Sequence, residues 1–116
     1  MVMRQIETNT VQQIVNKANT KRDFTRQIND NDKRYTVSVL SIYKGKNPSL
    51  DHNVSIKVGM VLDNDLYDSI GGWQGRDGYY LDANVDFYSL DNALMVARQY
   101  DQEAIYDKVN EQVISV

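Results

Sequence analysis

Three aspartates in one short segment are the first candidates for chemistry, because hard cations bind several carboxylate oxygens from a single loop. They are Asp63, Asp65 and Asp68. A calcium-binding loop places oxygen ligands at its first, third and fifth positions, a glycine at the sixth and an acidic residue at the twelfth. Here Tyr67 stands at the fifth position and Asp68 at the sixth. We therefore expect a solvated turn and no metal site.

The only histidine is the second candidate. His52 follows Asp51, and a carboxylate that orients an imidazole is the arrangement of a general base. Both residues lie in a turn-rich loop after Pro48, the sequence has no cysteine, and no serine lies in a nucleophile elbow. The sequence therefore predicts an exposed loop histidine, no enzymatic activity and no cofactor.

Four glycines between residues 71 and 78 are the third candidate, because glycine-rich loops bind phosphate groups. Their spacing matches neither the dinucleotide-binding fingerprint nor the phosphate-binding loop, and no lysine follows them. The spacing predicts a β-hairpin with a close backbone approach. Trp73 is then a hairpin-packing or core residue, and a small-molecule site near His52 and Trp73 is the alternative.

The charges are distributed unevenly between the two halves of the chain. Residues 1–57 contain ten Lys or Arg and five Asp or Glu, whereas residues 58–116 contain three and eleven. A basic stretch in the first half is the candidate nucleic-acid interface, because such stretches displace counterions from phosphates. Its cations are Lys17, Lys21, Arg22, Arg26, Lys33 and Arg34. Few aromatic residues accompany them and the sequence pI is about 5.0, so we treat nucleic-acid binding as the alternative function.

The acidic half is the preferred binding surface. Seven aspartates and four tyrosines lie between Asp63 and Asp91. Tyrosine is enriched at the energetically important centres of protein interfaces, and aspartate complements a basic partner. The competing interpretation is that these aspartates cap turns and these tyrosines fill strands. The predicted partner-binding residues are Tyr67, Asp68, Tyr79, Tyr80, Asp82, Asp86 and Tyr88.

The first third of the chain is predicted to be helical. Apolar residues at 11, 14, 15 and 18 follow helical spacing, which predicts a helix at about 9–20 with Thr8 or Thr10 as its N-cap. Residues 21–34 are charged and form either a second short helix or a mobile loop. A strand follows at 35–43, and its alternation slips at Val39-Leu40, which indicates a bulge or a strand covered on both sides.

The remainder of the chain is predicted to be mostly sheet. Residues 54–62 alternate between apolar and other residues, which predicts a strand paired with 35–43 in antiparallel fashion. The other predicted elements are strands at 66–73, 79–81, 104–106 and 112–116, a hairpin loop at 74–78, and a helix at 90–100 capped by Ser89. The fold class is then α+β. We expect one domain over residues 1–116, with an antiparallel sheet of five or six strands and one or two helices packed on one face.

A sequence module in the second half resembles known proteins. The module consists of Gly71-Gly72-Trp73, then Tyr80-Leu81-Asp82, then residues 90–94 and 104–107. It is similar to a Gly-Gly-Trp turn, Tyr-Leu-Asp strand, Leu-Asp-x-Ala-Leu helix and Ala-Ile-Tyr-Asp strand that recur in small uncharacterised proteins of bacteriophages, prophages and plasmids. The resemblance covers residues 71–107 and brings no activity with it. It implies an accessory protein of a mobile element, and such proteins often inhibit host enzymes or defences.

These observations lead to one preferred function. We expect a non-enzymatic accessory protein in the bacterial cytoplasm that binds a host protein with a basic surface, as an inhibitor of a host defence or nucleic-acid enzyme. The alternatives are nucleic-acid binding through the basic stretch, and a small-ligand-binding oligomer whose copies pair through their opposite charges. No apolar run approaches the roughly 18 residues of a membrane span, so we expect no membrane association.

Overall fold

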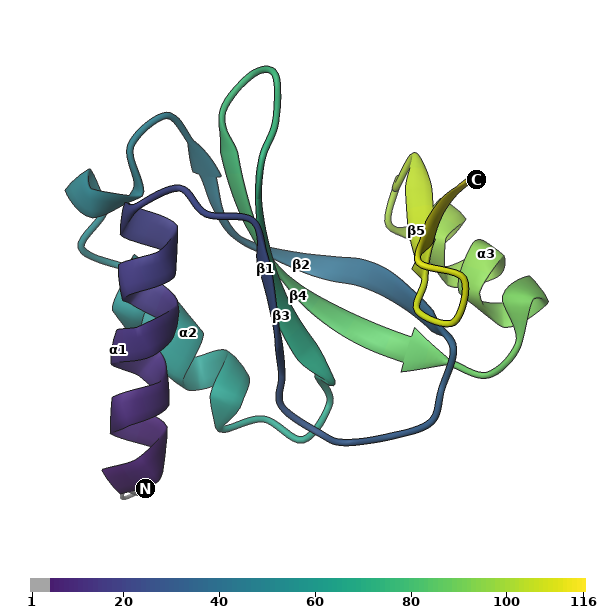
Figure 1. Ribbon diagram of the computed structural model, residues 1–116, viewed down its shortest axis with the longest axis horizontal. Coiled ribbons are helices and arrows are strands. Elements are labelled where there is room, and N and C mark those ends of the chain that lie inside the picture. The colour runs from purple at the N-terminus through teal and green to yellow at the C-terminus, as the bar shows by residue number, and fades with distance from the viewer. Residues whose placement is uncertain (1–4) are drawn as a thin grey trace.

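The computed structural model describes residues 5–116, and side chains from residue 9 onward (Figure 1). Within that range the helices are α1 (Gln5–Asn19), the short 3-10 helix η1 (Pro48–Leu50), α2 (Val54–Leu62) and α3 (Leu90–Gln99). The strands are β1 (Phe24–Gln27), β2 (Tyr35–Gly45), β3 (Ser69–Gln74), β4 (Tyr79–Phe87), β5 (Ala104–Asp107) and β6 (Gln112–Ser115).

All six strands form one antiparallel sheet in the order β1-β3-β4-β2-β5-β6. The predicted α+β class and antiparallel sheet are therefore confirmed. The long strand β2 joins the two halves of the sheet, because it pairs with β4 over almost its whole length and with β5 only at Tyr35 and Thr36. Its pairing with β4 shifts register between Ser38 and Leu40 and again between Ser41 and Tyr43. The slip in alternation at Val39-Leu40 is thus a bulge.

The helices cover one face of this sheet. Strand β4 buries Tyr79, Leu81 and Ala83 on that face, and they belong to a core that also contains residues of α1 and α2. A second core lies further along the same face, where α3 packs against Tyr35 and Val37 of β2. Val37 pairs with Val85, which follows Ala83 on the helix side of β4, so both cores share one face.

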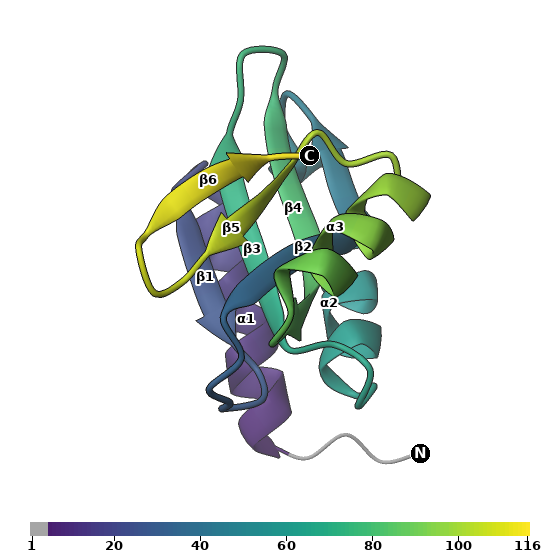
Figure 2. The ribbon, with the colours of Figure 1, turned by 90° about the vertical axis from the view of Figure 1, so that its right-hand side faces the viewer.

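The sheet is strongly curled, with the helices outside and the opposite face inside. Figure 1 shows α1 and α2 beside the β1-β3-β4 half and α3 beside the β5-β6 half, with the two halves of the sheet turned toward each other. Figure 2, viewed from the side, shows the β5-β6 hairpin crossing in front of β1, β3 and β4. Within residues 5–116, no helix lies on the concave inner face.

The predicted strand at 54–62 is wrong, because this segment is the helix α2. Its alternating apolar residues also fit helical spacing. Val54, Val58 and Val61 are buried at intervals of four and three residues, whereas Ile56 and Met60 are 62% and 67% exposed. The partner of residues 35–43 is consequently β4, and the predicted pairing with 54–62 is also wrong.

The prediction for the N-terminal third also needs correction. Helix α1 is already formed at Gln5, so Thr8 and Thr10 lie within the helix and do not cap its start. Residues 21–34 are neither a helix nor a free loop, because they contain the edge strand β1. The amides of Ile28 and Asn29 after β1 both donate to the Asp68 carbonyl, which holds the following segment against the start of β3.

The C-terminal half follows its prediction closely. The β3-β4 hairpin turns at residues 75–78, and Gly78 has φ +153° with no room for a side chain beside the Gly45 carbonyl. Strand β4 runs to Phe87, well beyond the predicted end at residue 81. The Ser89 hydroxyl accepts a hydrogen bond from the Asn92 amide and caps α3 as predicted.

Candidate binding groove

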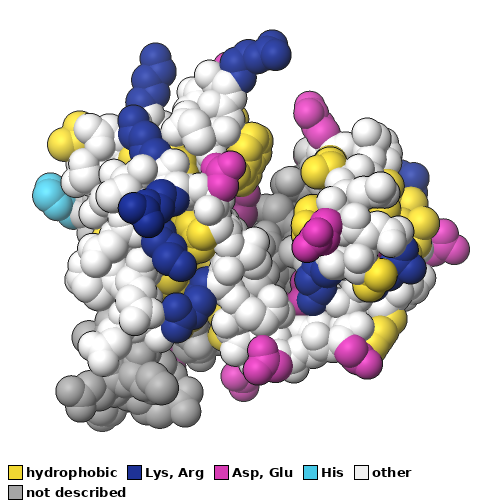
Figure 3. All heavy atoms as spheres, in the orientation of Figure 1, with side chains coloured by type: hydrophobic (Ala, Val, Ile, Leu, Met, Phe, Trp, Pro, Cys, Tyr) yellow, Lys and Arg dark blue, Asp and Glu magenta, His cyan; other side chains and the backbone are white. Residues whose placement is uncertain are grey.

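The concave face forms a groove between the two halves of the sheet. Directly paired residues of antiparallel strands share a face, so Trp73 lies beside Tyr80, and Gly71 lies beside Asp82, on the side away from the helices. On the opposite wall, Tyr106 of β5 pairs with Val113 of β6. Figure 3 shows a hollow between these walls, with apolar and acidic side chains along its rims. We call it the open groove, defined by Trp73, Tyr80, Asp82, Tyr106 and Val113.

An aromatic stack forms one wall of the open groove. The rings of Trp73 and Tyr80 are nearly parallel, with centroids 4.5 Å apart and planes inclined by 11°. The Lys44 ammonium group lies 5.5 Å from the centroid of Tyr80. Trp73 is 48% exposed, an unusual exposure for the only tryptophan of the chain. The stack is therefore a rigid, amphipathic surface that is available for binding.

Asp82 lies next to this stack in an environment that disfavours its charge. Burial raises the pKa of Asp82 to about 6, and hydrogen bonds from the side chains of Trp73 and Ser38 offset only part of this effect. None of the described Lys or Arg side chains forms a salt bridge with Asp82. The groove thus presents a partly desolvated carboxylate without a cation.

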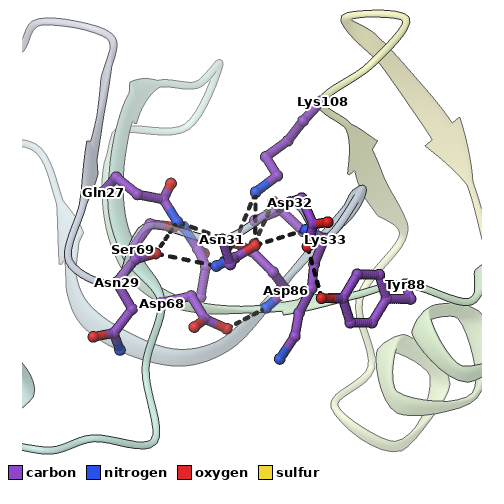
Figure 4. A network of polar contacts seen from close by, with 12 residues as sticks. Gln27, Asn29, Asn31, Asp32, Lys33, Asp68, Ser69, Asp86, Tyr88 and Lys108 are labelled. Atoms are coloured by element: carbon purple, nitrogen blue, oxygen red, sulfur yellow. Dashed lines mark hydrogen bonds and ion pairs between the residues drawn. The ribbon is translucent and has the colours of Figure 1, made fainter.

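A second carboxylate of β4 is fully satisfied. The Asp86 carboxylate accepts hydrogen bonds from the Thr36 hydroxyl at 2.6 Å, the Lys108 ammonium at 2.9 Å, and the Asn31 and Gln27 amides at 3.1 Å each (Figure 4). These donors keep the pKa of Asp86 below its usual range although burial opposes them. We call these five residues the Asp86 network. It ties β1, the segment 28–34, β2, β4 and the β5-β6 turn together at the base of the groove.

An ion pair between half-exposed Arg34 and buried Asp107 supports the same region. Arg34 donates two hydrogen bonds to Asp107, at 2.9 and 2.8 Å, in a bidentate arrangement. The Arg34 guanidinium, together with the backbone amides of Asn110 and Val109, lowers the pKa of Asp107 to about 2. This pair joins the start of β2 to the end of β5, where the two strands are adjacent.

The predicted partner-binding residues do not form one surface. Tyr80 and Asp82 lie together in the open groove, whereas Tyr79 and Asp86 are 0% and 2% exposed and are unavailable to a partner. The Tyr79 hydroxyl donates to the Arg22 carbonyl inside the helix-side core, and burial raises the pKa of Tyr79 to about 12. The assignment of Tyr79 and Asp86 to a partner-binding surface is therefore corrected: both hold the fold.

The other three predicted residues lie outside the groove walls. Asp68 accepts a hydrogen bond from the Asp86 amide and thereby supports the base of the groove. Tyr67 lines a helix-side pocket of about 340 Å³ beside β2 and α2. Tyr88 is exposed and donates to Asp32, next to the Asp86 network in Figure 4.

The basic stretch is divided by the fold. Four of its cations lie at the end of α1 and along β1, where Lys17 contacts the ring of Phe24 and Arg26 donates to Gln13. Lys33 and Arg34 precede β2 at the other end of the groove, and Arg34 is paired with Asp107. Figure 3 shows Lys and Arg gathered over the α1 half of the molecule. The six predicted residues thus form two separate groups.

The remaining chemical candidates lie elsewhere. His52 lines an open pocket of about 530 Å³ with Tyr43 and Lys46, on the far left of the view in Figure 3 and away from the groove. His52 and Trp73 therefore do not share a site. Among the residues whose placement is described, no three His, Cys, Asp or Glu residues are grouped so as to hold a metal ion.

The sequence favours a hairpin-packing or core role for Trp73, the principal residue of the groove, and gives ligand binding only as the alternative. It gives no indication of Lys44 or Ser38. A signal was present in the alternation of β4, where Tyr80, Asp82, Asn84 and Asp86 alternate with apolar residues. That pattern predicts a long strand with one polar face, and the antiparallel hairpin places Trp73 on that face.

Scans against protein-family models, curated proteins and solved structures each gave no match for this chain. No helix in the described part of the chain is long and apolar enough to cross a membrane.

Proposed function

We propose that this protein is a non-enzymatic binding protein whose open groove receives a basic surface of a partner protein. One observation carries the proposal: the exposed Trp73-Tyr80 stack lies beside Asp82, a partly desolvated carboxylate that no described cation neutralises. The resemblance of residues 71–107 to mobile-element proteins makes a bacterial host protein the expected partner. We expect binding to inhibit this host protein in the bacterial cytoplasm.

The composition of the groove favours a protein partner. Tyr106 is 41% exposed and Val113 is 72% exposed on the wall that faces the stack. Aromatic anchors within a partly apolar surface are typical of the centre of a protein interface. Asp86 adds little attraction for a cation because Lys108 already neutralises it, so Asp82 provides the unpaired negative charge.

The proposal is tested by affinity capture from bacterial lysate with groove variants. We expect Trp73→Ala and Asp82→Ala each to weaken binding of the captured basic protein by about 30-fold, the effect of losing an interface hot spot of roughly 2 kcal/mol. Retained binding by both variants, each still folded as shown by a cooperative thermal unfolding transition, would overturn the proposal.

Matched controls lie on α3 and immediately after it. Tyr100 is 51% exposed, close to the exposure of Trp73, and Asp91 is an exposed carboxylate in the first turn of the helix. Tyr100→Ala and Asp91→Asn remove the same kinds of group outside the groove. Both controls should bind the captured protein as the unaltered chain does.

Nucleic acid is the second candidate partner, because an exposed aromatic stack beside Lys44 is also typical of single-strand binding. Asp82 opposes this function, since a carboxylate next to the stack repels phosphate groups. Binding of a single-stranded oligonucleotide that weakens steeply with salt and is lost in Trp73→Ala would favour nucleic acid over protein.

A further inference from the structure

We propose that copies of this chain associate head to tail, with the edge strand β1 of one copy paired to the edge strand β6 of the next. This association does not depend on the proposed function, because it involves the two edges of the sheet and not the Trp73-Tyr80 stack. Three features of the edges support it. Both have free backbone hydrogen-bonding groups, they carry opposite charges, and neither complements itself.

The backbone of β6 is free on its outer side. The Val116 amide donates to the Glu103 carbonyl at 3.0 Å, which fixes the alternation of hydrogen bonds between β5 and β6. By this alternation Ile114 bonds to β5, whereas the N–H and C=O groups of Val113 and Ser115 point away from it. No strand of the described chain lies beyond β6, and Val113 is 72% exposed. The outer edge of β6 therefore offers donors and acceptors to another strand.

The opposite edge of the sheet has the same arrangement. The Ile28 amide donates to the Asp68 carbonyl at 2.7 Å, so Arg26 also bonds to β3 by the same alternation. The N–H and C=O groups of Thr25 and Gln27 consequently point outward, and the Thr25 side chain is exposed. Neither β1 nor β6 contains a proline or a bulge, two features that commonly prevent pairing at a sheet edge. Both edges are therefore open to strand addition.

The two edges carry opposite charges. Figure 3 shows Lys and Arg gathered over the half of the molecule that contains β1. The charged residues at and just before β1 are Lys21, Arg22, Asp23 and Arg26. At the other edge, Glu111 immediately precedes β6 and Glu103 immediately precedes the adjacent strand β5. Lys108, the only cation of the β5-β6 hairpin, is already paired with Asp86. The β1 edge is therefore basic and the β6 edge is acidic.

Opposite charge favours head-to-tail pairing over two-fold pairing. In antiparallel pairing, the arrangement of the whole sheet, the start of β1 lies beside the end of β6, which brings Arg22 toward Glu103 of the next copy. The end of β1 lies beside the start of β6, which brings Arg26 toward Glu111. Two β6 strands paired with each other would oppose glutamates, and two β1 strands would oppose cations. Contact between unlike edges is heterologous, so it continues into a ring or a filament.

Sedimentation equilibrium of the unaltered chain tests for this association. The contact is small, so we expect a reversible rise in average mass as the protein concentration approaches about 1 mM. Raising the salt concentration from about 0.05 to 0.5 M should weaken the association roughly fivefold, because the paired charges are exposed. A chain that stays monomeric at about 1 mM in low salt would overturn the proposal.

Two proline variants identify the paired edges. Thr25→Pro and Val113→Pro each remove an outward amide and leave the existing sheet bonds intact, because edge strands tolerate proline there. Each variant alone should be monomeric, whereas their equimolar mixture should form dimers and nothing larger, through one intact β1 and one intact β6. Dimers of either variant alone would reveal two-fold pairing and refute the head-to-tail arrangement. Thr25→Ala and Val113→Thr keep the amides and should associate as the unaltered chain does.

Charge reversal tests the same pairing without altering the backbone. Arg22→Glu with Arg26→Glu makes both edges acidic, so this double variant should not associate alone. Glu103→Lys with Glu111→Lys makes both edges basic and should likewise be monomeric. A mixture of the two double variants should associate again, because each acidic edge then meets a basic edge. A mixture that stays monomeric, with both variants showing cooperative thermal unfolding, would contradict the proposal. Lys57→Glu, on the exposed side of α2, is the control and should associate normally.

Discussion

Asp82 and Asp86 lie four residues apart on one face of one strand, yet their surroundings affect their ionisation in opposite directions. Asp86 receives four hydrogen bonds from side chains, including one from Lys108, and its pKa is lowered. Asp82 is partly desolvated without a cation, and its pKa is raised to about 6. Asp86 therefore stabilises the folded chain at neutral pH, whereas ionised Asp82 destabilises it.

The variant Asp82→Asn tests this difference. Because the folded-state pKa of Asp82 lies above the unfolded value, the folded chain loses stability as the pH rises from about 4 to 6 and the carboxylate ionises. We expect Asp82→Asn to raise the free energy of unfolding at pH 7.5 by about 2 kcal/mol and to remove this part of the pH dependence.

Urea unfolding at pH 4 and pH 7.5 measures the effect. The stabilisation by Asp82→Asn should be present at pH 7.5 and largely absent at pH 4, where Asp82 is protonated in the folded chain. Asp91→Asn is the control and should change stability little at either pH. A destabilised Asp82→Asn variant at pH 7.5 would contradict the electrostatic argument.

At the scale of elements, sequence patterns located most helices and strands, including α1 and β2, and failed at α2 and β1. Ser89 at the start of α3 and the glycine-rich β3-β4 hairpin are local signals that tertiary contacts did not override. In α2, by contrast, apolar residues satisfy both strand and helix periodicity, and packing against α1 and the sheet selects the helix. In β1, Phe24 faces the core and its neighbours are polar. This four-residue edge strand therefore lacks the alternation of apolar and polar residues that identifies a strand in a sequence.

The candidate site was predictable only in part, for a related reason. Tyr80 and Asp82 were identified from composition, but Tyr79 and Tyr80 are adjacent in a strand and point to opposite faces. Composition does not distinguish these faces, whereas strand register does. Trp73 joins the groove through its pairing with Tyr80, a contact that depends on the hairpin register.

Close approach of β1 to the hairpin depends on Gly72. A Cβ atom there would collide with the Tyr79 hydroxyl and the Phe24 ring. We expect Gly72→Ala to lower the free energy of unfolding by about 1 to 3 kcal/mol, the usual cost of overpacking a core. Gly71→Ala is the matched control, because its Cβ would meet only the Asn84 amide at 3.2 Å and the Phe24 carbonyl at 3.8 Å.

Thermal and urea unfolding of the two glycine variants give the comparison. The larger loss should occur in Gly72→Ala, and its near-ultraviolet circular dichroism should change because the Tyr79 ring must move. Equal losses in the two variants would show that the position beside Phe24 is not specially constrained.

At the scale of the whole molecule, two helix-covered cores are joined by one curled sheet. The α1-α2 core and the α3 core lie at opposite ends of the convex face, and β2 and β4 contribute residues to both regions. On the concave side, the Asp86 network connects β1 to the β5-β6 turn. The network therefore holds the α3 half against the rest of the molecule.

The variant Asp86→Ala should weaken the attachment of the α3 half to the rest of the molecule. It leaves the Lys108 ammonium without its carboxylate partner, with only a 3.4 Å contact to the Asn31 side-chain oxygen, and removes the acceptor of three other donors, so we expect a loss of about 3 to 5 kcal/mol in the free energy of unfolding. Amide hydrogen exchange should accelerate first in β5, β6 and residues 28–34, ahead of β3 and α1.

Asp32→Ala is the control for this variant, because Asp32 is exposed and accepts a side-chain hydrogen bond from Tyr88. Asp32→Ala should change the rates of amide hydrogen exchange little. In the unaltered chain, the contribution of Asp86 should be present above about pH 4 and be lost as acid protonates the carboxylate, since the folded-state pKa is the lower one. Uniform acceleration over all strands in Asp86→Ala would contradict a localised role.

The two irregularities in β2 affect how the molecule can change over evolutionary time. They lie where β2 passes from the α3 core to the α1-α2 core, at Ser38/Leu40 and Ser41/Tyr43. A bulge bends its strand and increases its twist, so gaining or losing one residue there alters the angle between the two halves of the sheet. Insertions or deletions at these two positions can therefore change the width of the groove while both cores keep their packing.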